Sequence, residues 1–294
     1  MEKLHIHFTL FSAAYSPLIA AMAGGFLARE GFDASFSVAE PGVSAISALE
    51  SGEAQVIQTA PSQGFMAVSR GEVPTAVHFA QINEMDVFFI SGRQADPDFK
   101  WHMLEDAEVI TFSGGQPLAM FQYACHKAGI SFDRVRRITV GGAAAMDAAF
   151  RDGQGAFIQQ QGPFPQQLED DGMGHVVAQS GPLIGPNAFS SVAATRDWLA
   201  TDQAKSFTRA YAQARRYMNE EAASEIAKSQ RAYFPKIDLD VLTRCITAYQ
   251  TLGCWTPHAE ITREAFAVAQ EVFIHSGSLS APVDYDSVCI LPPG

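Results

Sequence analysis

The chain is short of positive charge. It carries 20 Lys and Arg residues against 32 Asp and Glu residues, which gives a formal net charge of −12. A negative surface field of this size repels polyanions, so nucleic acid and anionic membranes are poor candidate partners, and we predict no nucleic-acid partner. No apolar stretch reaches the ~20 residues that a bilayer-spanning helix needs, so no membrane insertion is expected.

Cysteines are also few and scattered. The four cysteines, Cys125, Cys245, Cys254 and Cys289, form no Cys-x-x-Cys pair. We interpret them as buried thiols of a reducing compartment, with a Cys245 to Cys254 bridge left as an open alternative. The first residues, Met-Glu-Lys-Leu-His-Ile-His, contain no apolar signal segment. As written, the chain is therefore expected in the cytoplasm, and in the periplasm if a leader was removed.

The usual signatures of catalysis are missing. No His-Glu-x-x-His, Gly-x-Ser-x-Gly, phosphate loop or dinucleotide glycine fingerprint occurs. His5 and His7 are two apart on an expected strand, so they share one face in a geometry that suits a metal. Spacing indicates no third ligand for them. We therefore predict no catalytic residue, no cofactor and no metal site.

What the chain does contain is strands alternating with helices, which predicts an α/β fold with mostly parallel sheets and ligand loops at the strand carboxyl ends. With 294 residues and 47% hydrophobic composition, it is long enough for two lobes. After residue 195 the pattern becomes helical. The expected strands are 4–10, 34–39, 55–59, 75–80, 87–91, 108–112, 137–140, 155–159 and 175–179; the expected helices are 16–29, 43–51, 62–69, 118–128, 143–151, 164–170, 202–229, 238–252 and 262–276.

Several short motifs, in their order and spacing, resemble those of one family of binding proteins. They are Tyr15-Ser16-Pro17-Leu18-Ile19-Ala20-Ala21, Gly25 to Phe32, Ala48 to Val56, Arg209 to Ala214, Gly253-Cys254-Trp255 and Gly277-Ser278-Leu279. The chain is similar over nearly its whole length to the NMT1/THI5-like substrate-binding proteins of ABC-type uptake systems for alkanesulfonates, nitrate and thiamine precursors.

That resemblance implies a type II periplasmic-binding-protein fold, with two α/β lobes joined by a two-strand hinge and a helical C-terminal segment. Lobe I would comprise residues 1–88 and 190–294, and lobe II residues 89–189. A small-molecule ligand would bind between the lobes, and an ABC permease would be the partner.

The loops after the expected strands are polar and contain no Arg or Lys. Several of them lead into helix N-termini, whose free N–H groups and positive dipole end accept an oxyanion or a carbonyl oxygen. Tyr15 adds a stacking face, and Gln159, Gln160 and Gln161 add two-sided amides, of which we expect at least one in solvent. The predicted ligand-binding residues are Ser12, Tyr15, Gly42, Ser44, Thr59, Asn83, Gly115, Gln116 and Gln159.

Two kinds of function fit these features. The first is a solute-binding protein that captures a sulfonate, a carboxylate or a pyrimidine-like molecule. The alternative is an enzyme on the same scaffold that acts on a small aromatic or pyrimidine-type metabolite, as a thiamine-precursor synthase or a decarboxylase would. The segment Ile57 to Gln63 lacks the lysine and histidine expected of the synthase branch. A transcriptional effector domain is disfavoured because no helix-turn-helix precedes the first strand.

Overall fold

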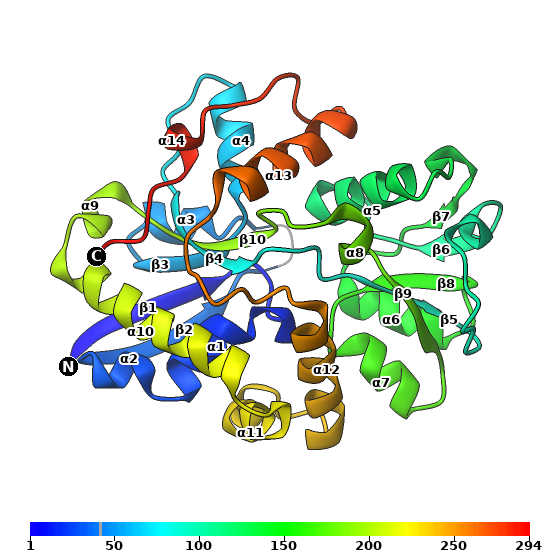
Figure 1. The fold of residues 1–294 in the computed structure, drawn as a ribbon, viewed down its shortest axis with the longest axis horizontal. Helices are drawn as coiled ribbons and strands as arrows, with labels where there is room; N and C mark the ends of the chain where they lie inside the picture. The colour runs from blue at the N-terminus through cyan, green and yellow to red at the C-terminus, as the bar shows by residue number, and fades with distance from the viewer. Residues whose placement is uncertain (41–42) are drawn as a thin grey trace.

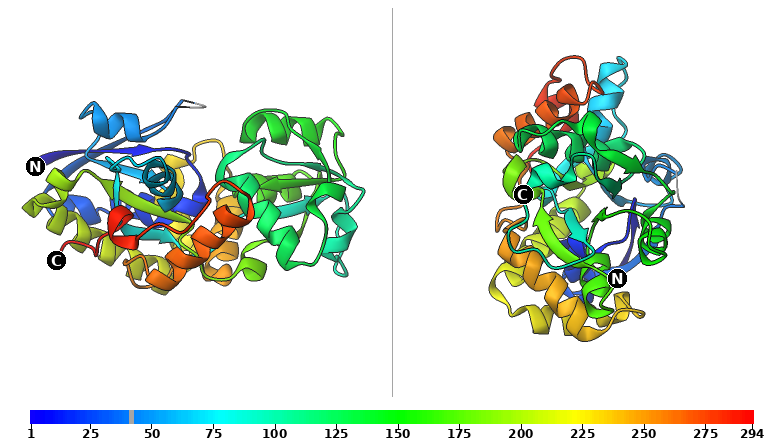
Figure 2. Two further views of the ribbon diagram at one scale, coloured as in Figure 1. Left: turned by 90° about the horizontal axis from the view of Figure 1, so that it is seen from above. Right: turned by 90° about the vertical axis from the view of Figure 1, so that its right-hand side faces the viewer.

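Two five-stranded sheets form the framework of the computed structural model, which describes residues 1–40 and 43–294. The first sheet has the strand order β2-β1-β3-β10-β4 and the second the order β7-β6-β8-β5-β9. Figure 1 shows the two sheets in separate bodies that lie side by side, and the left view of Figure 2 shows both bodies covered by helices. The strands are β1 (Glu2–Phe8), β2 (Phe32–Val38), β3 (Val56–Thr59), β4 (Val77–Asn83), β5 (Phe89–Gly92), β6 (Glu108–Ile110), β7 (Arg136–Ile138), β8 (Phe157–Gln160), β9 (His175–Gln179) and β10 (Ser190–Ala194).

Helices connect these strands and continue the chain after β10. The α-helices are α1 (Ser16–Ala23), α2 (Phe26–Arg29), α3 (Ile46–Glu50), α4 (Pro61–Ser69), α5 (Gly115–Lys127), α6 (Ala143–Arg151), α7 (Phe164–Asp170), α8 (Gly181–Ile184), α9 (Arg196–Leu199), α10 (Asp202–Glu220), α11 (Ala223–Gln230), α12 (Leu239–Leu252), α13 (Arg263–His275) and α14 (Tyr285–Val288). The short 3₁₀ helices are η1 (Ala13–Tyr15), η2 (Trp101–Leu104), η3 (Phe132–Arg134) and η4 (Arg231–Tyr233).

Each sheet mixes parallel and antiparallel pairs. Strand β1 runs parallel to β2 and β3, and β6 runs parallel to β7 and β8. Strand β10 is antiparallel to β3 and β4, and β5 is antiparallel to β8 and β9. The expected parallel sheets thus each hold one strand of opposite direction, placed directly after a connection between the bodies. Strand β10 was not foreseen, because its sequence Ser-Ser-Val-Ala-Ala has little of the apolar character of a fully buried strand.

We call the body of the first sheet lobe I and the body of the second sheet lobe II. The chain passes from β4 of lobe I to β5 of lobe II, and it returns from β9 to β10. The exact boundaries 1–88, 89–189 and 190–294 stay a prediction. They fall within or beside these two connections, which we call the crossovers (84–88 and 180–189).

Two expected helices are broken in the structure. The helix expected over 16–29 ends at Ala23 and restarts at Phe26, because Gly25 takes a φ of +68° that favours glycine. The helix expected over 202–229 breaks at Glu221. There the Gln250 side chain on α12 donates to the carbonyl oxygens of Met218 and Glu221 at 2.9 and 3.0 Å, so a tertiary contact satisfies the helix end.

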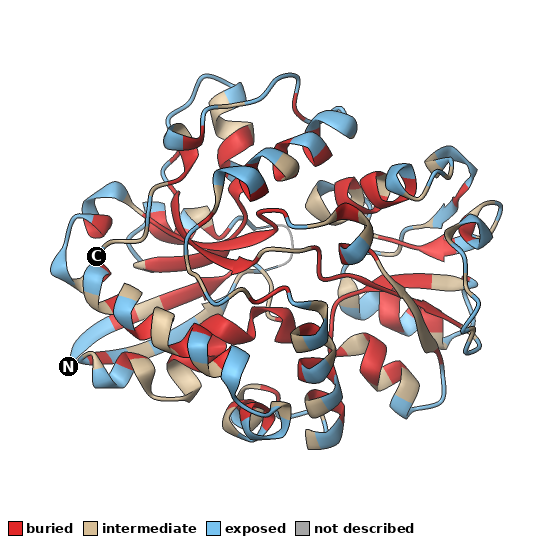
Figure 3. Ribbon diagram, in the orientation of Figure 1, coloured by how far each residue is buried: buried red, intermediate tan, exposed pale blue. Residues whose placement is uncertain are grey.

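Burial is concentrated on the strands and the inner helix faces (Figure 3). The largest apolar cluster fills lobe I and includes Met120 and Ala124 of α5, so the two lobes also meet through apolar contact. All four cysteines are free and buried, so the Cys245 to Cys254 bridge is not formed. None of the helices in the described residues is long and apolar enough to cross a membrane.

Candidate ligand-binding cleft

A cavity of about 180 Å³ lies where the two lobes meet. Strands β1 and β3 are parallel neighbours, and the residues at their carboxyl ends form one side of it. The starts of α4 and α5 and both crossovers complete the wall. The lining residues are Thr9, Leu10, Tyr15, Gln58, Thr59, Ala60, Gln63, Phe88, Gln116, Pro117, Gln161, Phe189 and Ser190. The volume is below the ~300 Å³ at the lower end of sites for drug-sized ligands, so a small metabolite is the size that fits.

The described lining residues carry no charge. Their polar groups are glutamine amides and hydroxyls. These groups can form hydrogen bonds with a ligand, but they carry no charge that could pair with an ionic one. Aromatic surface comes from both crossovers: the Phe88 and Phe189 rings lie 5.9 Å apart in an edge-to-face arrangement. A planar ligand would find apolar faces and amide edges in this wall.

Two helix N-termini at the cavity lack a side-chain cap. Helix α4 follows Ala60 and α5 follows Gly114, and neither residue provides a capping hydrogen bond. Of the helices away from the cavity, α9, α10 and α13 are capped by the hydroxyls of Thr195, Thr201 and Thr262, whereas α6, α11 and α12 also lack a side-chain cap. Pro61 and Pro117 have no N–H, and the Gln63 N–H donates to the Ala60 carbonyl oxygen at 3.0 Å. The first-turn N–H groups left for a ligand oxygen near the cavity are those of Ser62 and Gln116, which the helix dipoles would also favour.

Tyr15 and Gln161 place a donor and an acceptor on the wall. Burial raises the pKa of Tyr15 to about 12, against the opposing effect of a hydrogen bond with Gln161, so Tyr15 is a neutral phenol at physiological pH. The Oε1 atom of Gln161 is buried and has no hydrogen-bond partner in the structure. An unpartnered buried acceptor costs about 1–3 kcal/mol, and a ligand N–H would recover this free energy.

The two lobes are closed on one another. The Ser12 hydroxyl of lobe I donates to the carbonyl oxygen of Gly162 at 2.8 Å. The N–H of the same glycine donates to the Tyr249 hydroxyl of α12 at 2.7 Å. At the edge of the interface, Arg244 and Asp170 form an ion pair at 2.8 Å. These contacts bring the loop after β8 against η1 and α12, and they seal one side of the cavity.

The two crossovers pack tightly side by side. Asp86 is fully buried in the first crossover and accepts a hydrogen bond from the Phe88 N–H at 2.9 Å. Burial raises the pKa of Asp86 to about 7, although hydrogen bonds from Phe88 and Ser180 oppose the shift. A Cβ added at Gly181 of the second crossover would lie 2.5 Å from the Asp86 carbonyl oxygen. Only glycine allows this close approach.

Three of the predicted ligand-binding residues, Tyr15, Thr59 and Gln116, line the cavity. Tyr15 lies at the end of η1 and Thr59 at the end of β3. Gln116 is in the first turn of α5, and its Nε2 donates to the Phe189 carbonyl oxygen of the second crossover at 2.6 Å. The strand-end rule therefore located this part of the wall from the sequence, and the ligand contacts themselves stay a prediction.

Three more predicted residues are buried next to the cavity, where the protein itself takes up their donor groups, although Oδ1 of Asn83 and Oε1 of Gln159 have no partner among the described residues. Ser12 donates across the lobes to Gly162, as described above. Asn83 donates through Nδ2 to the Ser190 hydroxyl at 2.9 Å, and Gln159 donates through Nε2 to the Pro117 carbonyl oxygen at 3.1 Å. These residues support the wall from behind.

The remaining three lie elsewhere. Gly115 is exposed at the start of α5, beside the lining residue Gln116. Ser44 is exposed, and its hydroxyl accepts from the N–H of Ile46 at 3.3 Å at the start of α3, in a separate hollow against α4. Gly42 lies outside the described residues.

Some wall residues were missed by reasoning from the sequence. Gln159, Gln160 and Gln161 are all buried, so the expectation that at least one of them is in solvent is wrong. Gln159 and Gln160 belong to β8, which lies between β6 and β5 in the second sheet, and only Gln161 is in the loop that follows. The polarity of these residues gave no sign of either position. Phe88 and Phe189 look like ordinary strand-flanking apolar residues. Their position in the crossovers, which bracket any cleft between two lobes, was the one signal that pointed to them.

The chain matches known proteins over most of its length. The model of the NMT1-like family matches residues 2–230. YtlA of Bacillus subtilis (strain 168), whose name gives binding as its presumed role, is 23% identical over 295 residues, which cover 98% of this chain and 87% of YtlA.

Solved structures share the architecture. The periplasmic aliphatic sulphonate binding protein SsuA from Escherichia coli superposes with a TM-score of 0.76 at 16% identity, over 98% of this chain and 97% of SsuA. The alkanesulfonate-binding protein SsuA from Xanthomonas axonopodis pv. citri, bound to MOPS, gives a TM-score of 0.74 at 16% identity, over 99% of each chain. The expected fold, two α/β lobes of the periplasmic-binding-protein type, is confirmed.

Proposed function

Because the chain belongs to the NMT1-like family, we propose that it is a solute-binding protein that captures one small organic molecule between its lobes. The observation that carries the proposal is the cavity, whose wall combines loops of both lobes with uncharged polar and aromatic side chains. The binding roles in the names of YtlA and the two SsuA proteins support capture rather than turnover.

Among sulfonate, carboxylate and pyrimidine-like ligands, we favour the uncharged, pyrimidine-like class. An anion would have to leave water for a site with no cationic side chain in its described wall, and this desolvation costs several kcal/mol. A helix N-terminus returns about 0.3–1 kcal/mol, and up to about 2 in buried geometries. The net charge of −12 also repels anions at long range.

A flat ring with an amino group matches the wall group by group. Its N–H would donate to the unpartnered Oε1 of Gln161, and a ring nitrogen or carbonyl oxygen would accept from the first turns of α4 and α5. The ring faces would lie against Tyr15, Phe88 and Phe189. Groups from both lobes are needed for all of these contacts.

Binding would therefore act on the equilibrium between open and closed lobes. A ligand that touches both lobes binds the closed state better than the open one, and this difference in affinity drives closure. The crossovers would serve as the hinge. We further propose that the closed, loaded form delivers its ligand to a permease of an ABC-type uptake system. The E. coli relative is periplasmic by its name, and we propose the same compartment for this chain.

A thermal-shift screen tests this function with four probes: 4-aminopyrimidine, benzoate, butanesulfonate and nitrate. A ligand at a hundred times its Kd adds about 2.7 kcal/mol of stability, which gives a clear rise in Tm. We expect the rise with the aminopyrimidine. A rise with the anions alone would contradict an uncharged ligand. Product formation from the stabilising probe, followed by NMR, would favour the enzyme over the binding protein.

The Gln161→Ala variant locates the binding site. Loss of a buried hydrogen bond worth about 1–3 kcal/mol should raise the Kd of the stabilising probe about 5- to 150-fold, as measured by calorimetry. Gln154→Ala is the matched control, because Gln154 is an exposed glutamine of the same lobe outside the cavity. Equal Kd values for both variants would place the ligand elsewhere.

A further inference from the structure

We infer that a second site, on the outer face of lobe I, binds a divalent transition-metal ion such as Zn²⁺ through His5, His7 and Glu53. One ring nitrogen from each histidine and one carboxylate oxygen of Glu53 all lie within 4.8 Å of one another. The histidines share a strand, and the turn after α3 brings the glutamate to them. The fold thus supplies the third ligand that the spacing of the sequence did not indicate.

Strand β1 explains why the two histidines face outward together. Alternate residues Leu4, Ile6 and Phe8 are buried in the core of lobe I, so His5 and His7 point to the opposite face. The parallel neighbour β2 pairs Ser35 with His5 and Ser37 with His7. A polar ladder therefore runs along this face of the sheet.

The serines orient the imidazole rings. Ser35 Oγ lies 2.9 Å from Nδ1 of His5, and Ser37 Oγ lies 2.7 Å from Nδ1 of His7. Ser37 also contacts Nε2 of His5 at 2.7 Å, and release of this one contact frees that nitrogen. Both rings then keep a partner on Nδ1 and have Nε2 available for a metal. A hydrogen bond on the far ring nitrogen is the usual support of a metal-binding histidine.

The donor atoms also suit a transition metal. Two imidazole nitrogens and one carboxylate oxygen match zinc and related ions, whereas Mg²⁺ and Ca²⁺ prefer oxygen ligands alone.

The surface around His5 and Glu53 has room for a bound metal ion. His5 and Glu53 line an open hollow of about 470 Å³ together with Lys3, Asp33 and Ser35. Zinc bonds of 2.0–2.1 Å place tetrahedral ligand atoms roughly 3.3 Å apart, and the exposed Glu53 side chain is able to rotate into this position. A water molecule would take the fourth position.

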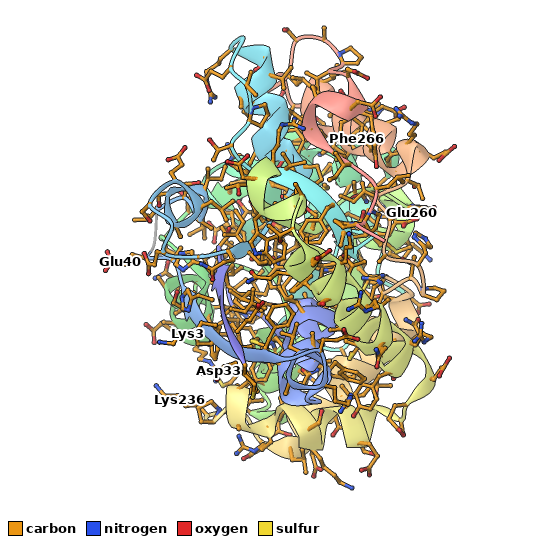
Figure 4. All side chains as sticks on the ribbon, turned by 90° about the vertical axis from the view of Figure 1, so that its left-hand side faces the viewer. Lys3, Asp33, Glu40, Lys236, Glu260 and Phe266 are labelled. Atoms are coloured by element: carbon orange, nitrogen blue, oxygen red, sulfur yellow. The ribbon has the colours of Figure 1, made fainter. Side chains whose placement is uncertain are left out.

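The hollow is separate from the ligand cavity. It lies toward the amino end of β1, where Figure 4 shows Lys3 and Asp33 near each other on the outer surface. Thr9 of the ligand cavity is four residues along the chain from His5, about 13 Å at ~3.3 Å per residue, and two residues from His7. A bound ion would tie the turn after α3 to β1 and stabilise lobe I without entering the cleft.

The test is a competition titration of the full chain, carrying no histidine tag, with Zn²⁺ and a chromophoric chelator. We expect one zinc ion per chain, weaker binding as the pH is lowered, and no competition by Mg²⁺. His5→Gln, His7→Gln and Glu53→Gln should each weaken zinc binding by at least about 10-fold. Zinc should also raise the Tm of the wild type and not that of the variants.

His275→Gln is the matched control, since His126 and His275 form the other close histidine pair of the described chain, with ring centroids 4.4 Å apart. Glu53→Gln keeps the test valid if His7→Gln fails to fold, because Glu53 is exposed. Absence of zinc binding at millimolar zinc would overturn the proposal. So would unchanged affinity in Glu53→Gln, or loss of binding in His275→Gln.

Discussion

Replacing Gly162 by alanine should push the two lobes apart. This glycine follows β8, and its N–H and carbonyl oxygen both bond to lobe I residues across the interface. A Cβ at this position would overlap the Sγ atom of Cys245 and lie 3.1 Å from Cε2 of Tyr249. Both of these residues are fully buried on α12, so neither side chain has free space to move into.

The overlap with Cys245 and Tyr249 falls on the closed state alone, because opening the lobes separates residue 162 from α12; a contact of 3.1 Å with Gln166 Oε1 stays within lobe II. An extra methyl group in a well-packed site costs about 1–3 kcal/mol. Through the equilibrium between closed and open forms, that free energy corresponds to a loss of about 5- to 150-fold in the ratio of closed to open molecules. The variant should therefore be folded but more open.

Small-angle X-ray scattering measures this difference directly. We expect a larger radius of gyration for Gly162→Ala than for the wild type, with an unchanged far-UV circular dichroism spectrum. Adding Cys245→Ala removes the overlapping sulfur and should restore the compact form. Gly142→Ala is the control, since a Cβ there meets nothing within 4 Å. A wild-type scattering profile for Gly162→Ala, or no recovery in the double variant, would refute this reasoning.

Three further variants test the core, the hinge and a helix cap. Burial holds the folded pKa of Asp86 at about 7, above an unfolded value of about 3.9, so the folded state keeps a proton that the unfolded state releases. Urea unfolding should show stability falling by about 3 kcal/mol from pH 5 to pH 8, and Asp86→Asn should remove that part of the pH dependence. Arg215→Met should lower the free energy of unfolding in the same assay by about 3 kcal/mol, because the buried guanidinium donates to the carbonyl oxygens of Ile82 and Thr256 at 3.1 and 2.9 Å. A loss below about 1 kcal/mol would contradict this role. Thr262→Ala should lower the free energy of unfolding by about 1 kcal/mol through loss of the α13 cap, measured as a lower Tm; an unchanged Tm would contradict the cap.

Much of the local structure follows from the sequence. Helices α6 and α7 and strand β9 have the expected bounds, since apolar periodicity and flanking glycines act over a few residues. Gly129 takes a left-handed conformation, with a φ of +73°, directly after α5, which is the position where helices commonly end in glycine. Strand β10 and the break at Glu221 were missed because their causes are distant: pairing with β3 and β4 in one case, and the Gln250 side chain in the other.

The residues of the candidate sites were likewise only partly predictable from the sequence. Tyr15, Thr59 and Gln116 could be placed near a ligand because residues after parallel strands gather at one edge of a sheet.

The sequence by itself determined most of the elements, the two-lobed class and the absence of Arg and Lys from the loops after the strands. The elements follow from residues that are neighbours in the chain. Only the tertiary structure decided that Gln161 is buried with a free acceptor, that Phe88 and Phe189 complete the cavity, and that Glu53 meets the histidine pair. These contacts join segments far apart in the chain, and sequence spacing carries no information on where a closing lobe or a turn between strands will lie.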